Sequence, residues 1–129
     1  MKWSIIGCGN ISNKFCEDLS NVNDTTILAI ASKNPEKLKS FGDRFKVPKE
    51  KRFHGYESIL NLDFDIAYVG LINSLHKKII KTLATKGKNI IIEKPCFLNL
   101  KDFKDCEDLI ILEHSQENTS FFSEFFFLF

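Results

Sequence analysis

The sequence predicts a single α/β domain built on a doubly wound parallel sheet. Three observations support this prediction: a glycine-rich turn follows the first apolar run, strand and helix patterns alternate along the chain, and the central apolar runs lack a polar face. Parallel strands have this last property because helices cover both faces of their sheet. The alternation reads βαβαβαβαβαβ, with right-handed crossovers.

Strand and helix patterns alternate through the first half of the chain. Asn34 followed by Pro35 is a typical helix start, because Asn caps a helix and Pro suits its first position. The pair Val47-Pro48 ends that helix. The predicted elements are a strand over 2–6, a helix through Ile11, Phe15 and Leu19, a strand over 25–31, a helix through Leu38, Phe41 and Phe45, an extended piece over 51–56 and a small helix over 57–60.

The second half continues the same alternation. Ser74 and Asn99 are each expected to cap a helix, and Gly87 suits a left-handed helix stop. The predicted elements are a strand over 66–71, a helix carrying Leu75, Ile79, Ile80 and Leu83, a strand over 89–92, a helix from Asn99 to about Glu113, and a last strand over 120–127.

Length and charge limit the possible functions. The chain has 129 residues and a mass of 14.9 kDa, which fits one ordinary domain and excludes a second full one. Charged residues make up 27% of the chain, the net charge is +1, and the lysines are interspersed with acids. We therefore expect no nucleic-acid binding.

Cysteine spacing and the ends of the chain indicate a reduced, cytoplasmic setting. Cys8, Cys16, Cys96 and Cys106 show neither C-x-x-C spacing nor a metal-finger pattern, so no metal site is expected. No leader precedes the first strand. The apolar tail over 121–129 is far shorter than the ~20 residues of a membrane-spanning helix, so we expect no membrane anchor.

The turn Gly7-Cys8-Gly9-Asn10-Ile11-Ser12 is the main candidate for a phosphate-binding loop. Gly7 permits the tight bend, Gly9 lets the backbone approach a pyrophosphate, and the next helix presents free N–H groups to negative charge. Ser12 takes the third glycine position and is small enough for close packing, while Cys8 is expected to fill space. The alternative is a plain glycine turn, but the flanking strand and helix favour a Rossmann-type dinucleotide site.

The end of the second strand selects between NAD and NADP. An acidic residue there would hold the ribose hydroxyls and repel a 2′-phosphate. This chain has Ser32 and Lys33, a hydroxyl and a cation that can accept the phosphate. We therefore predict NADP, with NAD as the alternative cofactor; the other interpretation of Lys33 is a solvated lysine before a helix.

Polar residues follow the fourth and fifth strands, at the edge where open α/β sheets bind ligands. Asn73 and His76 follow the fourth strand, and the alternative for His76 is a structural or solvent-exposed histidine. Glu93 and Lys94 follow the fifth strand. The turn Glu93-Lys94-Pro95 directs the Lys94 ammonium into the crevice, because the proline restricts the backbone there.

Together these motifs resemble one known family. Residues 1 to about 127 are similar to the N-terminal domain of the glucose-fructose oxidoreductase and inositol dehydrogenase family, Gfo/Idh/MocA. Within it, Trp3-Ser4-Ile5-Ile6 and Ser32-Lys33 look most like NADP-dependent dihydrodiol dehydrogenases and related sugar dehydrogenases. The matching pieces are the Gly7 to Ser12 turn, the helix over 34–45, the run over 65–70, Asn73-Ser74-Leu75-His76 and the run over 87–95.

The resemblance implies hydride transfer between NADP and a sugar or diol hydroxyl in the full-length enzyme, of the trans-dihydrodiol or D-xylose dehydrogenase kind. It implies that Lys94 is catalytic, contacting the substrate hydroxyl and the cofactor ribose and stabilising alkoxide character. The implied cofactor-binding residues are Gly7, Cys8, Gly9, Asn10, Ile11, Ser32, Lys33, Gly70, Leu71, Asn73, His76, Glu93 and Lys94.

The chain departs from the family pattern in three ways. Ile72 replaces a proline usual before Asn73, and Leu128 replaces an arginine common after the last strand. The resemblance implies a C-terminal α/β substrate domain that supplies the remaining acid/base group, and we expect that domain to be missing. We therefore expect a NAD(P)-binding domain over 1–120, and over 121–129 the last strand and the start of a connection to an absent domain.

Two functions remain open at this stage. One is the cofactor half of a dehydrogenase, inactive as this chain and with a small polyol or sugar as partner only when the second domain is present. The other is a truncated, non-catalytic dinucleotide-binding or interaction protein, which the length favours. The phenylalanine-rich tail over 121–129 should leave apolar surface at its free end, so we expect self-association or a homo-oligomer through it.

Overall fold

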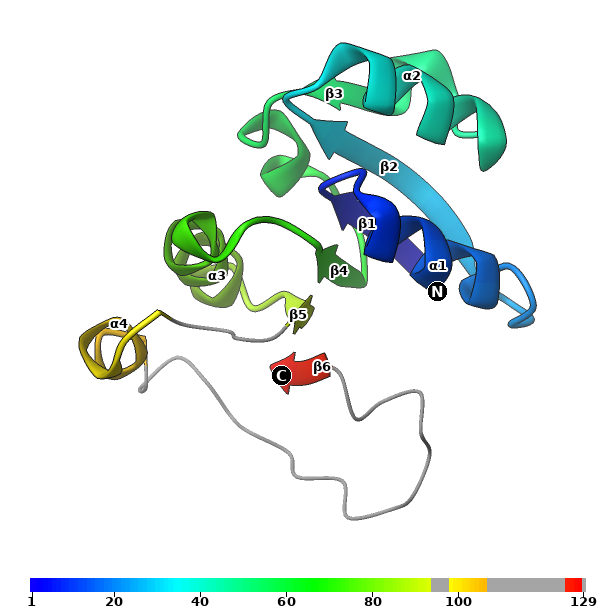
Figure 1. Cartoon of the computed structure of the whole chain (residues 1–129). Helices are drawn as coiled ribbons and strands as arrows, with labels where there is room; N and C mark the ends of the chain where they lie inside the picture. The colour runs from blue at the N-terminus through cyan, green and yellow to red at the C-terminus, as the bar shows by residue number, and fades with distance from the viewer. Residues whose placement is uncertain (94–97, 107–124, 129) are drawn as a thin grey trace.

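A sheet with helices on both faces organises the computed structural model, which describes residues 1–93, 98–106 and 125–128 (Figure 1). Within these residues the strand order is β3-β2-β1-β4-β5-β6. The strands are β1 Lys2–Ile6, β2 Thr26–Ser32, β3 Arg52–His54, β4 Ile66–Val69, β5 Asn89–Glu93 and β6 Phe125–Leu128. The helices are α1 Asn10–Leu19, α2 Pro35–Arg44, α3 His76–Thr85 and α4 Leu100–Lys104, with short 3-10 helices η1 Lys49–Lys51, η2 Ser58–Asn61 and η3 Asn73–Leu75.

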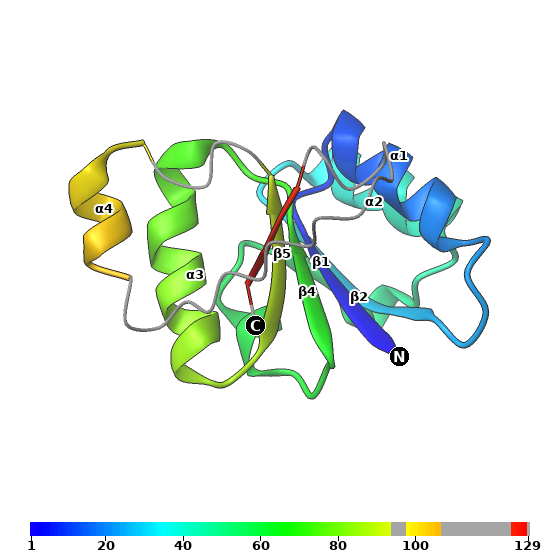
Figure 2. The same ribbon diagram turned by 90° about the horizontal axis from the view of Figure 1, so that it is seen from below.

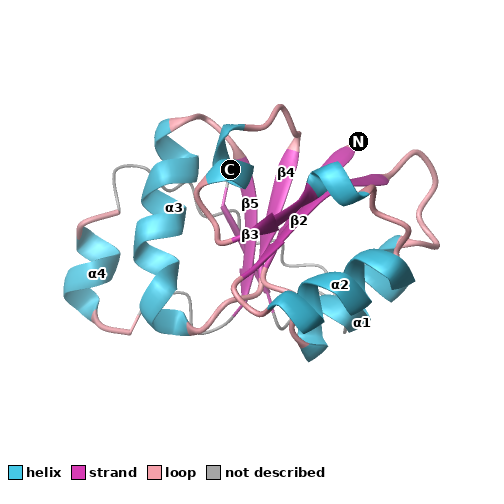
Figure 3. Ribbon diagram, turned by 90° about the horizontal axis from the view of Figure 1, so that it is seen from above, coloured by secondary structure: helices cyan, strands magenta, loops and turns pink. Residues whose placement is uncertain are grey.

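The predicted doubly wound parallel sheet is confirmed for the first five strands. β3, β2, β1, β4 and β5 pair in parallel. Helices α1 and α2 cover one face, and α3 and α4 lie on the other (Figures 2 and 3). The alternation of strands and helices predicted this arrangement, because each crossover helix must bury its apolar side on the sheet.

The direction of the last strand differs from the prediction. β6 pairs antiparallel with β5, with Glu93 opposite Phe125 and Ile90 opposite Leu128. The chain therefore enters β6 at the edge where β5 ends, which removes the need for a crossover back to the start of β5. An antiparallel edge strand on a mostly parallel sheet is common in α/β folds.

Two apolar layers hold the helices on the sheet, and the strand residues alternate between them. In β4, Ala67 and Val69 join the cluster that contains Ile79, Ile80 and Leu83 of α3. Ile66 and Tyr68 join the opposite cluster, with Phe15 and Leu19 of α1 and Phe41 of α2. Both faces of the central strands are therefore buried, as their unbroken apolar runs predicted.

Most of the predicted helix signals are confirmed. The Asn34 side chain accepts a hydrogen bond from the backbone N–H of Lys37 at 2.9 Å, and that of Asn99 accepts one from Asp102 at 2.9 Å. Gly87 ends α3 with φ +64°, and its N–H donates to the Ala84 carbonyl at 2.9 Å. This is the left-handed stop that glycine allows without steric cost.

Ser74 is not the cap of α3, so that prediction is wrong. The chain first forms η3, in which the N–H of Leu75 donates to the Ile72 carbonyl at 3.0 Å, and α3 begins at His76 after Leu75. Ser74 therefore lies inside the 3-10 turn η3. Leu75, and not Ser74, occupies the position before α3 from which a side chain caps the first free N–H groups.

Several element boundaries also differ from the predictions. The strand predicted over 66–71 ends at Val69, and the extended piece over 51–56 shortens to β3 because Gly55 turns the chain at φ +91°. The helix predicted to reach Glu113 ends at Lys104 with a turn at 105–106. Residues 107–124 and the side chains of the tail lie outside the described part, so the domain boundary at 120 and self-association stay predictions.

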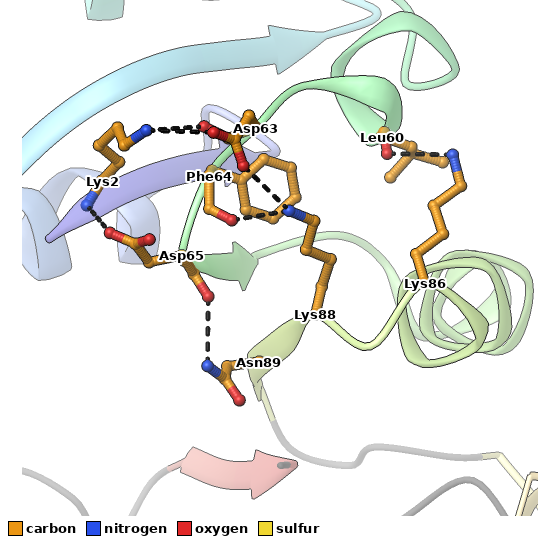
Figure 4. Close-up of polar contacts among 8 residues, drawn as sticks. All are labelled: Lys2, Leu60, Asp63, Phe64, Asp65, Lys86, Lys88 and Asn89. Atoms are coloured by element: carbon orange, nitrogen blue, oxygen red, sulfur yellow. Dashed lines mark hydrogen bonds and ion pairs between the residues drawn. The ribbon is translucent and has the colours of Figure 1, made fainter.

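Polar contacts tie together the edge of the sheet where β1, β4 and β5 begin (Figure 4). The backbone N–H of Lys2 donates to the Asp65 carboxylate at 2.6 Å, and the Asn89 side chain donates to the Asp65 carbonyl at 3.3 Å. The Lys88 ammonium donates to the Phe64 carbonyl at 2.9 Å and lies 4.8 Å from the Phe64 ring centroid. These contacts help to fix the register of three parallel strands.

Replacing Lys88 with methionine should destabilise the fold. Lys88→Met keeps the apolar stem but leaves the buried Phe64 without the donor to its carbonyl, so we expect the free energy of unfolding to fall by about 1–2 kcal/mol in urea denaturation. The control is Lys14→Met at an exposed site on α1. Equal stability of the two variants would contradict the role of Lys88.

Candidate functional site

The ends of four parallel strands bring most of the predicted site residues to one edge of the sheet. Because β1, β2, β4 and β5 run in the same direction, the segments that follow them lie along this shared carboxyl edge. Lys94, the predicted catalytic residue, lies outside the described residues. The others are placed as follows: Gly7, Cys8, Gly9, Asn10 and Ile11 after β1, Ser32 and Lys33 at the end of β2, Gly70, Leu71, Asn73 and His76 after β4, and Glu93 at the end of β5.

Gly7 makes the tight turn that the sequence predicted, and the reason is twofold. Its φ is +101°, a conformation that side chains disfavour, and its N–H donates to the Ala31 carbonyl of β2 at 2.9 Å. A Cβ at Gly7 would also clash with the carbonyl oxygen of Gly70 and lie 2.8 Å from its carbonyl carbon. The turns after β1 and β4 are therefore packed backbone against backbone.

Gly9 leaves the start of α1 open. It is the residue before the helix, its φ of −84° suits any residue, and a Cβ added there would meet no atom within 4 Å. Among the described residues no side chain caps α1, and its first turn carries no acid. The free N–H groups and the partial positive charge of this helix end can therefore receive an anion that approaches the Gly9 backbone.

Ser12 packs closely on the turn after β4, as its small size predicted. The residue is only 1% exposed, and a Cβ added at Gly70 would clash with its hydroxyl oxygen. The same Cβ would lie 2.9 Å from a ring carbon of Tyr68. Gly70 is thus the residue that lets β4 and α1 approach each other beneath the glycine turn.

Tyr68 connects α1 to the end of β5, a contact that sequence reasoning missed. Its ring stacks on Phe15 of α1, with centroids 4.1 Å apart and an angle of 13°, and its hydroxyl donates to the Glu93 carboxylate at 2.6 Å. Burial and the Glu93 carboxylate raise the pKa of Tyr68, so the phenol stays a donor. The periodicity marked Tyr68 only as a buried strand residue.

His76 holds the loop after β4. Its side chain is fully buried, and its Nε2 lies 2.9 Å from the Leu71 carbonyl oxygen. The imidazole therefore supports the backbone of the turn that faces the carboxyl edge. Direct contact between His76 and a cofactor stays a prediction.

The end of β2 carries a hydroxyl and a cation. Ser32 is 5% exposed, its hydroxyl accepts from the Asn34 N–H at 3.1 Å, and its carbonyl accepts from the Gly55 N–H at 3.1 Å. Lys33 is exposed, and its ammonium lies 5.5 Å from the centroid of the Tyr56 ring. Tyr56 is a second residue that the sequence did not indicate.

Cys8 occupies the role of a buried filler that its position predicted. The residue is 5% exposed, and burial raises the pKa of its thiol to about 12. The thiol therefore stays protonated and unreactive at neutral pH. Within the described residues no group of three or more His, Cys, Asp or Glu side chains could hold a metal ion, and no helix is long and apolar enough to cross a membrane.

The chain matches a protein family over almost its entire length. Residues 1–124 match the family described as "Oxidoreductase family, NAD-binding Rossmann fold", GFO_IDH_MocA. Over 101 residues the chain is 37% identical to trans-1,2-dihydrobenzene-1,2-diol dehydrogenase of Xenopus tropicalis, a match that covers 76% of this chain and 30% of the relative.

Solved structures share the same fold. The 3-ketoreductase KijD10 from Actinomadura kijaniata, crystallised with NADP, has a TM-score of 0.74 and 27% identity, over 84% of this chain and 34% of that one. An oxidoreductase from Agrobacterium radiobacter, crystallised with NAD+, L-tartaric acid and magnesium, has a TM-score of 0.77 and 25% identity, over 84% and 33%. The chain thus spans about a third of the length of these relatives.

Replacing Gly7 with alanine should disrupt the close contact between the turns after β1 and β4. We expect Gly7→Ala to lower the free energy of unfolding by more than about 2 kcal/mol, because it adds both backbone strain and a clash with Gly70. Gly87→Ala is the matched control, since Gly87 has φ +64° but open space around a Cβ. Equal losses in urea unfolding would show that the Gly7 contact with Gly70 contributes nothing.

Proposed function

This chain belongs to the Gfo/Idh/MocA oxidoreductase family with an NAD-binding Rossmann fold, and on that premise we propose that it binds NADP at its carboxyl edge as the cofactor domain of a dehydrogenase that acts on a sugar or diol hydroxyl. The supporting observation is the open start of α1 beside Gly9. A pyrophosphate there would receive the N–H groups of the first helical turn, and the absence of a Cβ at Gly9 gives it room.

Ser32 and Lys33 are the proposed contacts of the adenosine ribose and its 2′-phosphate. Ser32 still has a hydroxyl proton to donate, because its oxygen acts as acceptor toward Asn34. Lys33 supplies a positive charge at the position where an acid would select NAD. KijD10, a structural relative, was crystallised with NADP, which supports the same choice.

The nicotinamide end of the cofactor is proposed to lie over the turns after β4 and β5. Bound NADP would accept a hydride from the carbinol carbon of the substrate. The described contacts give each turn a separate support, since His76 holds the Leu71 carbonyl and Tyr68 holds the Glu93 carboxylate. The residues proposed to line this path are Cys8, Asn10, Ile11, Gly70, Leu71, Asn73, His76 and Glu93, beside Gly7 and Gly9.

Lys94 is proposed to be the catalytic residue. In the sequence it comes directly after Glu93, the residue that ends β5 at the carboxyl edge. An ammonium at that edge would stabilise negative charge on the substrate oxygen while the hydroxyl loses its proton and the carbon loses a hydride. The base that takes the proton and most of the substrate pocket are proposed to come from a second domain, because this chain spans only 30% of the diol dehydrogenase it matches.

A side chain at Gly9 should weaken cofactor binding without unfolding the protein. Because a Cβ at Gly9 meets no protein atom, Gly9→Ala should keep the unfolding midpoint of the wild type. The same Cβ would stand where the pyrophosphate comes closest, so we expect NADPH affinity to fall at least about tenfold in a fluorescence titration. Unchanged affinity would place the phosphates elsewhere.

Removal of the Lys33 charge should weaken NADPH binding selectively. Lys33→Met is expected to lower NADPH affinity by about five- to tenfold and leave NADH affinity unchanged, because only NADPH carries the 2′-phosphate. Lys104→Met, on α4 across the sheet, is the control for net charge. A wild type with equal affinity for the two cofactors would contradict the NADP preference.

A further inference from the structure

The ring of Tyr56 lies under the Lys33 ammonium at the carboxyl edge. Tyr56 follows β3 and is 9% exposed, and it belongs to the apolar cluster that also contains Ala31 of β2 and Ile59 of η2. The Lys33 ammonium lies 5.5 Å from the centroid of its ring. This separation is within the range of a cation–π interaction.

The backbone fixes the ring beneath the turn that carries Lys33. β2 and β3 end in register, with Ser32 opposite His54, and the Gly55 N–H donates to the Ser32 carbonyl at 3.1 Å. Gly55 then turns the chain at φ +91°, which returns Tyr56 to the core. Burial raises the pKa of Tyr56, so its ring stays a neutral phenol that adds no charge at this edge.

The Tyr56 ring contacts the Lys33 ammonium without neutralising its charge. A carboxylate partner would cancel the charge that a phosphate needs, whereas a ring face leaves the ammonium free to bind an anion on its other side. The neighbouring acid, Glu57, accepts from the Tyr56 N–H at 3.2 Å and lies 3.9 Å from the Lys78 ammonium. Backbone N–H groups lower the pKa of Glu57 most, and the charges of Lys78 and Lys33 add to this, but within the described residues no ion pair joins Glu57 to Lys33.

We propose that Tyr56 is a positioning residue that sets the preference for NADP by holding Lys33 beside Ser32. A free lysine must give up the freedom of four side-chain bonds when it binds a phosphate. A lysine that already packs over the Tyr56 ring has lost part of that freedom, so it binds the 2′-phosphate at a lower entropic cost. This inference rests on the proposed function, since it concerns the same cofactor.

The test compares two substitutions at Tyr56 by titration with NADPH and NADH. Tyr56→Leu removes the ring and should lower NADPH affinity by about two- to fivefold while NADH affinity stays unchanged. Tyr56→Phe keeps the ring and should bind both cofactors like the wild type. An equal loss for both cofactors, or a phenylalanine variant as impaired as the leucine variant, would overturn the inference, because a structural defect does not distinguish the 2′-phosphate.

A second measurement does not depend on cofactor binding or on the stability of Tyr56→Leu. In the proton NMR spectrum of the wild type and of Tyr56→Phe, the ε-methylene protons of Lys33 should be shifted upfield of those of exposed lysines such as Lys14. Unshifted Lys33 ε-methylene protons would overturn this inference. The proposed function would still stand if the wild type prefers NADPH. A wild type that binds neither cofactor would contradict the proposed function, and the selectivity role would fail with it.

Discussion

The close contact between Gly7 and Gly70 is the constraint on which the rest of the site depends. Two backbone turns, after β1 and β4, meet where neither residue has room for a Cβ. Gly70 also approaches the Ser12 side chain of α1, so α1, the first strand and the fourth strand meet at this one contact. This contact places the start of α1 at the carboxyl edge with open space beside Gly9, where the proposed pyrophosphate would bind.

Two tyrosine side chains add contacts on either side of Gly7 and Gly70 along the carboxyl edge. Toward β5, Tyr68 stacks on Phe15 and holds the Glu93 carboxylate, so the residue before Lys94 is coupled to α1. Toward β3, Tyr56 lies beneath Lys33, and Gly55 binds the Ser32 carbonyl. The proposed pyrophosphate, adenosine and nicotinamide contacts are thus supported by one buried framework, and their relative positions are not set by loops alone.

Local signals in the sequence predicted the fold, but these signals could not predict the tertiary contacts. The caps at Asn34 and Asn99, the stop at Gly87 and the two-sided apolar strands depend on neighbours along the chain, and all were predicted. The direction of β6 depends on where the chain re-enters the sheet, and the turn at Ser74 depends on η3. The glycine turn predicted the tight bend at Gly7, whereas the contacts of Tyr56 and Tyr68 are with partners distant in sequence.

The central claim is that the carboxyl edge around Gly7, Gly9 and Gly70 receives a dinucleotide. Amide chemical shifts of the isotope-labelled chain, followed during titration with NADPH, test it most directly. The account predicts that the largest changes fall on these glycines and on Ser32, with little change at Lys2, Asp65 and Lys88 on the opposite edge. Changes centred on that opposite edge, or none at saturating NADPH, would contradict it.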